Sequence, residues 1–208
     1  ILPKDDPLFS QAPEGKRCLL NIHGKPMVQW VLDALGHSKC IDDIYLIGLS
    51  EQQKLVATKP IHYLQEEGGL FENIRAGVMA ATENNHPSSK VMLASGDLPA
   101  IQPEMVDWLC FQVTQDPDAV IYYNVITQEV MSSRFPHAKR TFVRLKDLTV
   151  CGGDMNVVDR DLFVKENTLW KKLSNARKSP LKQVSLLGFD SLILVALRLV
   201  TLEQAVQR

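Results

Sequence analysis

The chain has few cysteines and no pair of them at the spacing of a metal site. Its four cysteines are far apart and form no CxxC pair; they are Cys18, Cys40, Cys110 and Cys151. Zinc sites and disulfide-stapled domains use closely spaced or numerous cysteines. We therefore expect four reduced thiols and a cytoplasmic protein, without a disulfide framework or a zinc site.

The chain also lacks a strong charge of either sign and a long apolar run. A formal net charge of -1 over 208 residues argues against a nucleic-acid-binding surface and against a polybasic membrane anchor. The most apolar segment, residues 186–200, is about 15 residues long, whereas a membrane-spanning helix needs roughly 20. We expect no nucleic-acid partner and no membrane span, and a core or interface helix that could mediate a homodimer.

Two common hydrolytic signatures are missing as well. No serine lies in a GxSxG pattern and no histidines lie in an HExxH pattern, so the sequence does not support a serine hydrolase or a zinc peptidase. The five histidines are interpreted as surface or turn residues.

Strand and helix patterns alternate along the first part of the chain. Helices are predicted over 26–37, 70–82 and 103–114, and strands over 44–49, 61–64, 91–94 and 118–125. This alternation is typical of an α/β fold with a mostly parallel sheet. In the third helix, Met105, Leu109 and Val113 are expected to point inward and Trp108 to lie in the core. Further on, 141–145 suggests an edge or antiparallel strand, 150–158 a glycine turn followed by a strand, and the chain beyond Asp159 mostly helix.

The most informative segment is KVMLASGDLP, residues 90–99. Its apolar run predicts a buried strand that ends at the turn containing Gly96 and Pro99. Asp97 is thereby left at the carboxyl end of a strand, the edge of an α/β sheet where ligands bind. Mg²⁺ is commonly held by one such carboxylate together with phosphate oxygens. Asp97 could equally be a residue that only caps the turn.

Four segments in order give the chain its resemblance to a known family. They are RCLLNIHGKPMVQWVLDAL, GGLFENIRAGV, VMLASGDLPAIQPEMV and RTFVRLKDLTVCGGDMNVVDRDLF, which span roughly residues 16–163. Together they resemble the MobA-like nucleotidyltransferases, which include molybdenum-cofactor guanylyl- and cytidylyltransferases and sugar-phosphate nucleotidyltransferases.

The resemblance implies a Rossmann-like three-layer sandwich, the nucleotide-diphospho-sugar transferase fold. It implies one domain over residues 1–208, with a nucleotide-binding part (1–115), an acceptor-binding part (116–160) and a helical C-terminal part (161–208). The family begins with a strand and a glycine-rich phosphate-binding loop, and a second metal-binding carboxylate usually lies near its C-terminus. Nothing before Ile1 matches that strand, so we expect the N-terminal strand to be missing from this chain.

The resemblance also implies a Mg²⁺-dependent reaction between an NTP and a small phosphorylated acceptor, with release of pyrophosphate. The matching positions comprise catalytic residues Asp97 (also the metal ligand) and Lys25; nucleotide-binding residues Lys16, Arg17, Gly68, Gly69, Asn73 and Gly96; and acceptor-binding residues Gly152, Gly153 and Asp154. Arg17 stands where relatives have the phosphate-binding lysine, and Asp154 stands where they often have asparagine. The phosphate ligand could be either Lys16 or Arg17.

Two other features leave the function open. Without the glycine-rich loop and the second carboxylate, the chain could be a catalytically silent nucleotide-binding module of the same fold. Arg134, Lys139, Arg140, Arg144 and Lys146 form a local basic stretch. This stretch could face an anionic acceptor or be a solvated edge.

Overall fold

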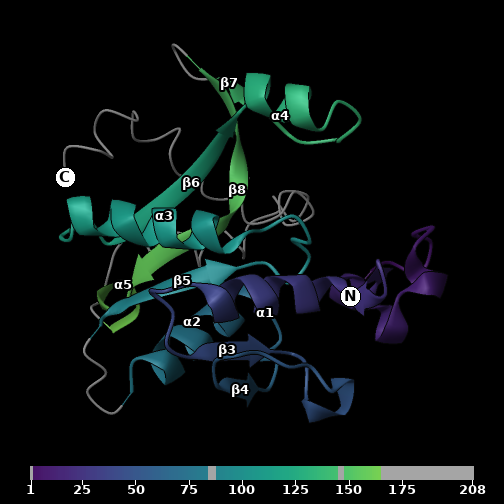
Figure 1. The fold of residues 1–208 in the computed structure, drawn as a ribbon, viewed down its shortest axis with the longest axis horizontal. Coiled ribbons are helices and arrows are strands. Elements are labelled where there is room, and N and C mark those ends of the chain that lie inside the picture. Colours follow the sequence, from purple (N-terminus) through teal and green to yellow (C-terminus); the bar gives the residue numbers. More distant parts are fainter. Residues whose placement is uncertain (1, 84–87, 145–147, 165–208) are drawn as a thin grey trace. The chain divides into compact units, whose positions relative to one another are not determined.

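The computed structural model describes residues 2–83, 88–144 and 148–164 (Figure 1). These residues belong to two compact units. The first unit contains residues 1–86 and 93–118, and the second contains 87–92 and everything after 118. The segment 186–200 and most of the predicted C-terminal helical part lie outside the described residues. No helix within the described ranges is long and apolar enough to cross a bilayer.

The first unit is built from helices and a parallel strand pair. Its elements are β1 (Asn21–Ile22), β2 (Lys25–Pro26), α1 (Met27–His37), β3 (Ile44–Ile47), β4 (Ile61–Leu64), α2 (Leu70–Ala81) and α3 (Pro103–Gln115), preceded by short 3₁₀ helices that include η3 (Arg17–Leu19). β3 and β4 are parallel, with Ile44 opposite Ile61. Both α1 and α2 contact β3, and α1 also contacts α3. The helices and strands predicted in this part of the chain are therefore confirmed, with shifts of a few residues at their ends.

The core of the first unit forms around one face of α1. Val28 and Leu32 lie one helical turn apart and are each only 1% exposed. They form a buried cluster with residues from the preceding 3₁₀ helix, from β3 and from the following loop: Leu19, Ile44, Leu49 and Leu55. This packing holds the amino-terminal segment, including η3, against the helix.

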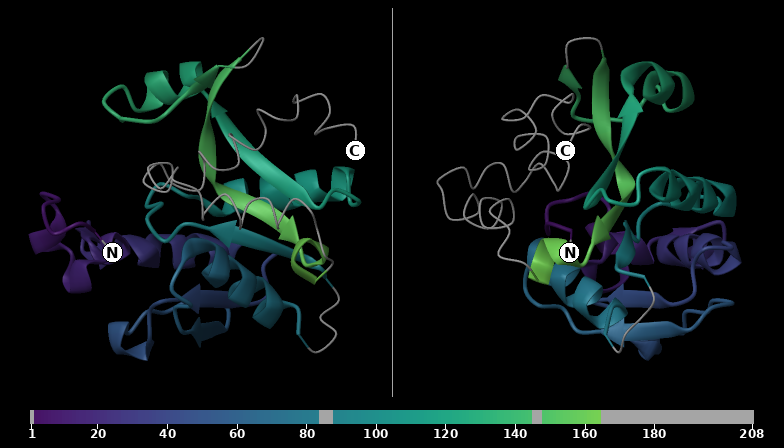
Figure 2. Two further views of the ribbon diagram at one scale, coloured as in Figure 1. Left: turned by 180° about the vertical axis from the view of Figure 1, so that it is seen from behind. Right: turned by 90° about the vertical axis from the view of Figure 1, so that its left-hand side faces the viewer.

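The second unit contains the longest strand of the described chain. Its elements are β5 (Lys90–Ala94), whose last two residues belong to the first unit, β6 (Ile121–Thr127), α4 (Gln128–Arg134), β7 (Val143–Arg144), β8 (Thr149–Asp159) and α5 (Asp161–Val164). The strand order is β5-β8-β6, with β7 also paired to β8. β6 and β7 both run antiparallel to β8, and β6 and β8 stay side by side in both views of Figure 2.

These pairings correct two expectations from the sequence. The parallel arrangement is seen for β3 and β4, whereas β8 is antiparallel to two neighbours, so "mostly parallel" does not describe the second unit. The predicted glycine turn is also wrong, because Gly152 and Gly153 lie inside β8. The register between β6 and β8 shifts between Tyr123 and Val125, and glycine suits such an irregularity because it has no side chain to accommodate.

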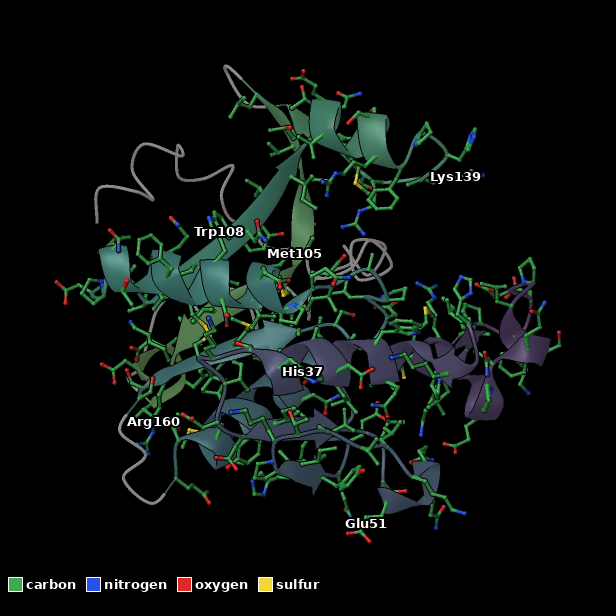
Figure 3. All side chains as sticks on the ribbon, viewed as in Figure 1. His37, Glu51, Met105, Trp108, Lys139 and Arg160 are labelled. Atoms are coloured by element: carbon green, nitrogen blue, oxygen red, sulfur yellow. A yellow bond between two sulfur atoms is a disulfide. The ribbon has the colours of Figure 1, made fainter. Side chains whose placement is uncertain are left out.

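The inward face of α3 agrees only in part with the one expected, because Leu109 is buried as predicted. Val106 and Leu109 are buried, whereas Met105 is 41% and Trp108 is 55% exposed; both exposed residues are labelled on α3 in Figure 3. The expectations for Met105 and Trp108 were wrong because apolar residues occupy two faces of this helix. Helical spacing alone does not show which of two apolar faces is buried.

The four cysteines were expected to be reduced, and this was wrong for two of them. Cys40 and Cys110 form a disulfide across a sequence separation of 70 residues, while Cys18 and Cys151 are free. The disulfide joins the loop after α1 to α3. The same two segments are joined by Asp107, which accepts hydrogen bonds from the Ser38 hydroxyl (2.6 Å) and from the backbone N–H of Lys39 (2.9 Å).

Candidate active site

Asp97 lies in the turn that directly follows β5. Ser95 and Gly96 separate it from Ala94, the last residue of the strand. The Ser95 hydroxyl donates a hydrogen bond to Asp97 Oδ1, and Arg17 Nη1 lies 3.6 Å from Asp97 Oδ2. The Asp97 side chain is 31% exposed, so a ligand can reach the carboxylate from solvent.

Close packing at Gly96 brings this turn next to the amino-terminal segment. A Cβ added at Gly96 would lie 3.3 Å from Cys18 Cβ and 3.6 Å from Val28 Cγ2. The absence of a side chain at Gly96 therefore lets the turn approach η3, and Arg17 next to Cys18 reaches Asp97. Burial, followed by the negative charge of Asp97, raises the pKa of the Cys18 thiol. Because a thiol reacts as the thiolate, Cys18 is a poor nucleophile here.

Lys16 and Arg17 are adjacent in sequence but have different partners. Lys16 Nζ lies 2.7 Å from Glu14 Oε2, and Gln53 Nε2 donates to Glu14 Oε1 at 2.8 Å. Hydrogen bonds from Lys16 and Gln53 lower the pKa of Glu14. Arg17 is the cation next to Asp97, and its side chain is 53% exposed.

Lys25 follows a tight turn and points to α1. The turn joins β1 to β2 through His23 and Gly24, which both have positive φ (50° and 88°). Lys25 Nζ forms an ion pair with Asp33 and lies 3.6 Å from the centre of a Trp30 ring. The structure thus gives Lys25 an anionic partner within its own segment. The predicted catalytic role of Lys25 stays a prediction.

The residues predicted to bind the nucleotide in the loop before α2 also stabilise that loop. Gly68 has a φ of 88°, a conformation that favours glycine, and Gly69 is the N-cap residue of α2. Asn73 Oδ1 accepts a hydrogen bond from the backbone N–H of Glu67 at 2.7 Å. A Cβ at Gly68 would have no heavy atom within 4 Å, so the glycine leaves an open surface at this loop.

The three candidate acceptor residues lie on β8 in the second unit, beside an arginine. Arg140 Nη2 donates to the backbone oxygen of Gly152 at 2.6 Å and lies 3.3 Å from Asp154 Oδ2. A Cβ at Gly153 would lie 3.1 Å from the backbone oxygen of Asn124, so Gly153 permits close packing against β6. Arg140, a member of the basic stretch, is thus in direct contact with Gly152 and Asp154.

The structure brings some predicted residues together and leaves others apart. Within the described part of the first unit, an ion pair joins Arg17 to Asp97, whereas Lys25 is paired with Asp33 and Asn73 with the backbone of Glu67. Sequence reasoning missed Ser95, which bonds to Asp97 Oδ1. A hydroxyl two residues before an aspartate in a turn was the available signal, because serine and aspartate side chains bond locally in turns.

Comparison with known proteins identifies the family. Residues 10–148, about two thirds of the chain, match the MobA-like NTP transferase domain. The chain belongs to this family. The resemblance seen in the sequence is confirmed, and the MobA-like domain makes the chain a transferase of the nucleotidyltransferase type. No curated protein sequence matches the chain.

Solved structures agree with this assignment of the MobA-like domain. A hypothetical transferase from Thermus thermophilus is 32% identical, with a TM-score of 0.64 over 88% of this chain and 72% of that one. A CMP:2-keto-3-deoxy-manno-octonic acid synthetase solved with CTP is 17% identical, with a TM-score of 0.58 over 93% of this chain and 81% of that one. A 4-diphosphocytidyl-2C-methyl-D-erythritol synthase from Anaerococcus prevotii is 12% identical, with a TM-score of 0.54 over 82% and 73%. The last two show likeness of fold.

The donor groups at Asp97 suit a hard cation. Mg²⁺ is usually held by one or two carboxylates, with water and substrate phosphates supplying the other ligands. Asp97 provides one partly exposed carboxylate of this kind. Among the described residues, no three histidine, cysteine or acidic side chains gather as a metal cluster. At such a carboxylate, water and substrate phosphates can supply the remaining ligands of a cation.

Proposed function

We propose that the chain is a Mg²⁺-dependent nucleotidyltransferase that joins an NMP from an NTP to a small phosphorylated acceptor and releases pyrophosphate. The observation that carries the proposal is Asp97 at the end of β5, partly exposed and 3.6 Å from Arg17. One carboxylate and one guanidinium at the end of a strand can serve a metal-bound triphosphate, because they hold the cation and the phosphates respectively.

The reaction places few covalent demands on the protein. An oxygen of the acceptor phosphate forms a bond to the α-phosphorus, and the bond from that phosphorus to the bridging oxygen of the β-phosphate breaks. Pyrophosphate leaves with the electron pair. Catalysis of such transfers rests on positioning and on neutralising charge. Bound Mg²⁺ would supply part of that neutralisation.

The chain's own residues have separable roles in this proposal. Asp97 would bind the cation, with Ser95 orienting its carboxylate, and Arg17 would bind triphosphate oxygens as a planar fork. Of the two cations left open by the sequence, Arg17 is preferred because it lies beside Asp97, whereas Lys16 is directed to Glu14. The open glycine surface at Gly68 and Gly69 would border the nucleoside.

The second unit supplies the candidates for the acceptor. Arg140 holds Gly152 and Asp154, and it is charged at any working pH. Arg140 would recognise the phosphate of the acceptor, while Gly152, Gly153 and Asp154 shape the surface beside it. Lys139, labelled in Figure 3, lies next to Arg140 in the same basic stretch.

Pyrophosphate release tests this function. The wild-type chain, Asp97→Asn and the control Asp42→Asn would be assayed with Mg²⁺, each of four NTPs and a panel of phosphorylated acceptors. Asp42 is an exposed carboxylate in the loop before β3. We expect release by the wild type and by the control, and a loss of about 100-fold or more in Asp97→Asn. Equal rates in all three proteins would refute the role of Asp97.

A catalytically silent nucleotide-binding module is the second candidate. The ion pair between Lys25 and Asp33 favours this candidate, because it engages a side chain that was expected to be catalytic. Calorimetry of NTP with Mg²⁺ in the same samples distinguishes the two functions. Binding without pyrophosphate release from any acceptor would support the silent module, and absence of NTP binding would refute both.

A further inference from the structure

Both carboxylate oxygens of Asp97 have partners within the chain. Ser95 donates to Oδ1, and the Arg17 guanidinium lies 3.6 Å from Oδ2. Close packing of Gly96 on Cys18 brings the turn that carries Asp97 next to the segment that carries Arg17. The position that a cation would take at Oδ2 therefore lies beside a positive charge.

A divalent cation and the Arg17 guanidinium are competitors for one carboxylate. They carry the same sign of charge, so binding a cation at Oδ2 requires the guanidinium to move away. The ion pair is exposed to solvent (53% for Arg17 and 31% for Asp97), and such pairs are weak. Arg17 can thus leave Asp97 at small cost when a better anion is available.

A triphosphate is such an anion. Guanidinium groups bind phosphate oxygens through two parallel hydrogen bonds, which are stronger than a single contact to a carboxylate. We propose that Arg17 occupies the metal-binding carboxylate until a nucleoside triphosphate arrives, and then transfers to the phosphates and frees Asp97 for the cation. This inference rests on the proposed function. Its consequence is that cation and triphosphate bind together, and a cation alone binds weakly.

The exchange predicts reciprocal effects of two substitutions. Arg17→Gln frees Asp97, so the affinity for Mn²⁺ alone rises by up to about five-fold, which corresponds to about 1 kcal/mol. Asp97→Asn frees Arg17, so the affinity for metal-free tripolyphosphate rises by a similar factor. In the opposite sense, Arg17→Gln weakens tripolyphosphate binding and Asp97→Asn removes Mn²⁺ binding.

Calorimetry with Mn²⁺ alone and with tripolyphosphate alone measures these affinities. Lys39→Gln makes the same change in net charge as Arg17→Gln at an exposed position of the same unit, so it should leave Mn²⁺ affinity at the wild-type value. The double variant Arg17→Gln/Asp97→Asn is needed as well, because removing the negative charge of Asp97 would itself favour a polyanion. If Arg17 mediates the gain in tripolyphosphate affinity, the gain disappears in the double variant.

The outcomes separate the exchange from the proposed function. Mn²⁺ affinity that is unchanged or lower in Arg17→Gln would overturn the exchange, and so would a gain in tripolyphosphate affinity that persists in the double variant. If Asp97→Asn leaves Mn²⁺ binding intact, the cation site itself is wrong and the proposed function fails with it. Thermal unfolding of each variant checks that its fold is intact. We expect little change in the unfolding temperature, because an exposed ion pair contributes little to stability.

Discussion

Reducing the Cys40–Cys110 disulfide should destabilise the protein strongly, because this bond closes a long loop. The two cysteines are 70 residues apart in the sequence. The chain-entropy relation for cross-links gives a loss of about 4 kcal/mol in the free energy of unfolding for a loop of roughly that length. Chemical denaturation with and without a reductant measures this loss as a shift of the midpoint.

Thiol counting and a double variant make the disulfide prediction sharp. Alkylation of the denatured, unreduced protein should label two of its four cysteines, Cys18 and Cys151. The variant Cys40→Ser/Cys110→Ser should unfold at the midpoint of the reduced wild type and should not respond to reductant. Four labelled cysteines without reductant, or a reductant-dependent midpoint in the double variant, would refute the reasoning.

Two further predictions concern stability. Burial raises the pKa of Asp159, but hydrogen bonds from Lys90 and other donors outweigh this effect and hold the pKa below its usual value. The free energy of unfolding should therefore fall as the pH drops below about 4, and it should fall less steeply in Asp159→Asn. Denaturation measured at a series of pH values tests this, and the same pH dependence in both proteins would refute it. Gly36→Ala should lower the free energy of unfolding by about 1–3 kcal/mol in the same assay, because the new Cβ would lie 2.8 Å from Thr58 Oγ1 and 3.2 Å from the Thr58 backbone nitrogen. In the control Gly77→Ala the new Cβ meets only the flexible end of a side chain, so this variant should stay within about 1 kcal/mol of the wild type. Equal losses in the two variants would show that the backbone contact does not matter.

The sequence alone was sufficient to predict the local helices and strands and to recognise the family. Apolar spacing predicted α1, α2 and α3, and the run before Asp97 predicted β5, because helix and strand periods depend on residues near one another in the chain. The order of the four motif segments was sufficient for the family, since those segments match a shared pattern. The turn after β5 could also be predicted, because glycine and proline restrict the backbone locally.

Only the tertiary structure decided which distant residues meet. The disulfide joins two cysteines that no local sequence pattern relates. The antiparallel pairing of β6 with β8 likewise joins two strands that are not adjacent in the sequence. Arg17 and Asp97 are 80 positions apart, and their contact follows from the packing of Gly96 on Cys18. The resemblance implied a catalytic role for Lys25, but only the structure shows that Asp33 of α1 is its ion-pair partner. Such contacts depend on packing over the whole unit, so the sequence could propose the site residues but could not show their partners.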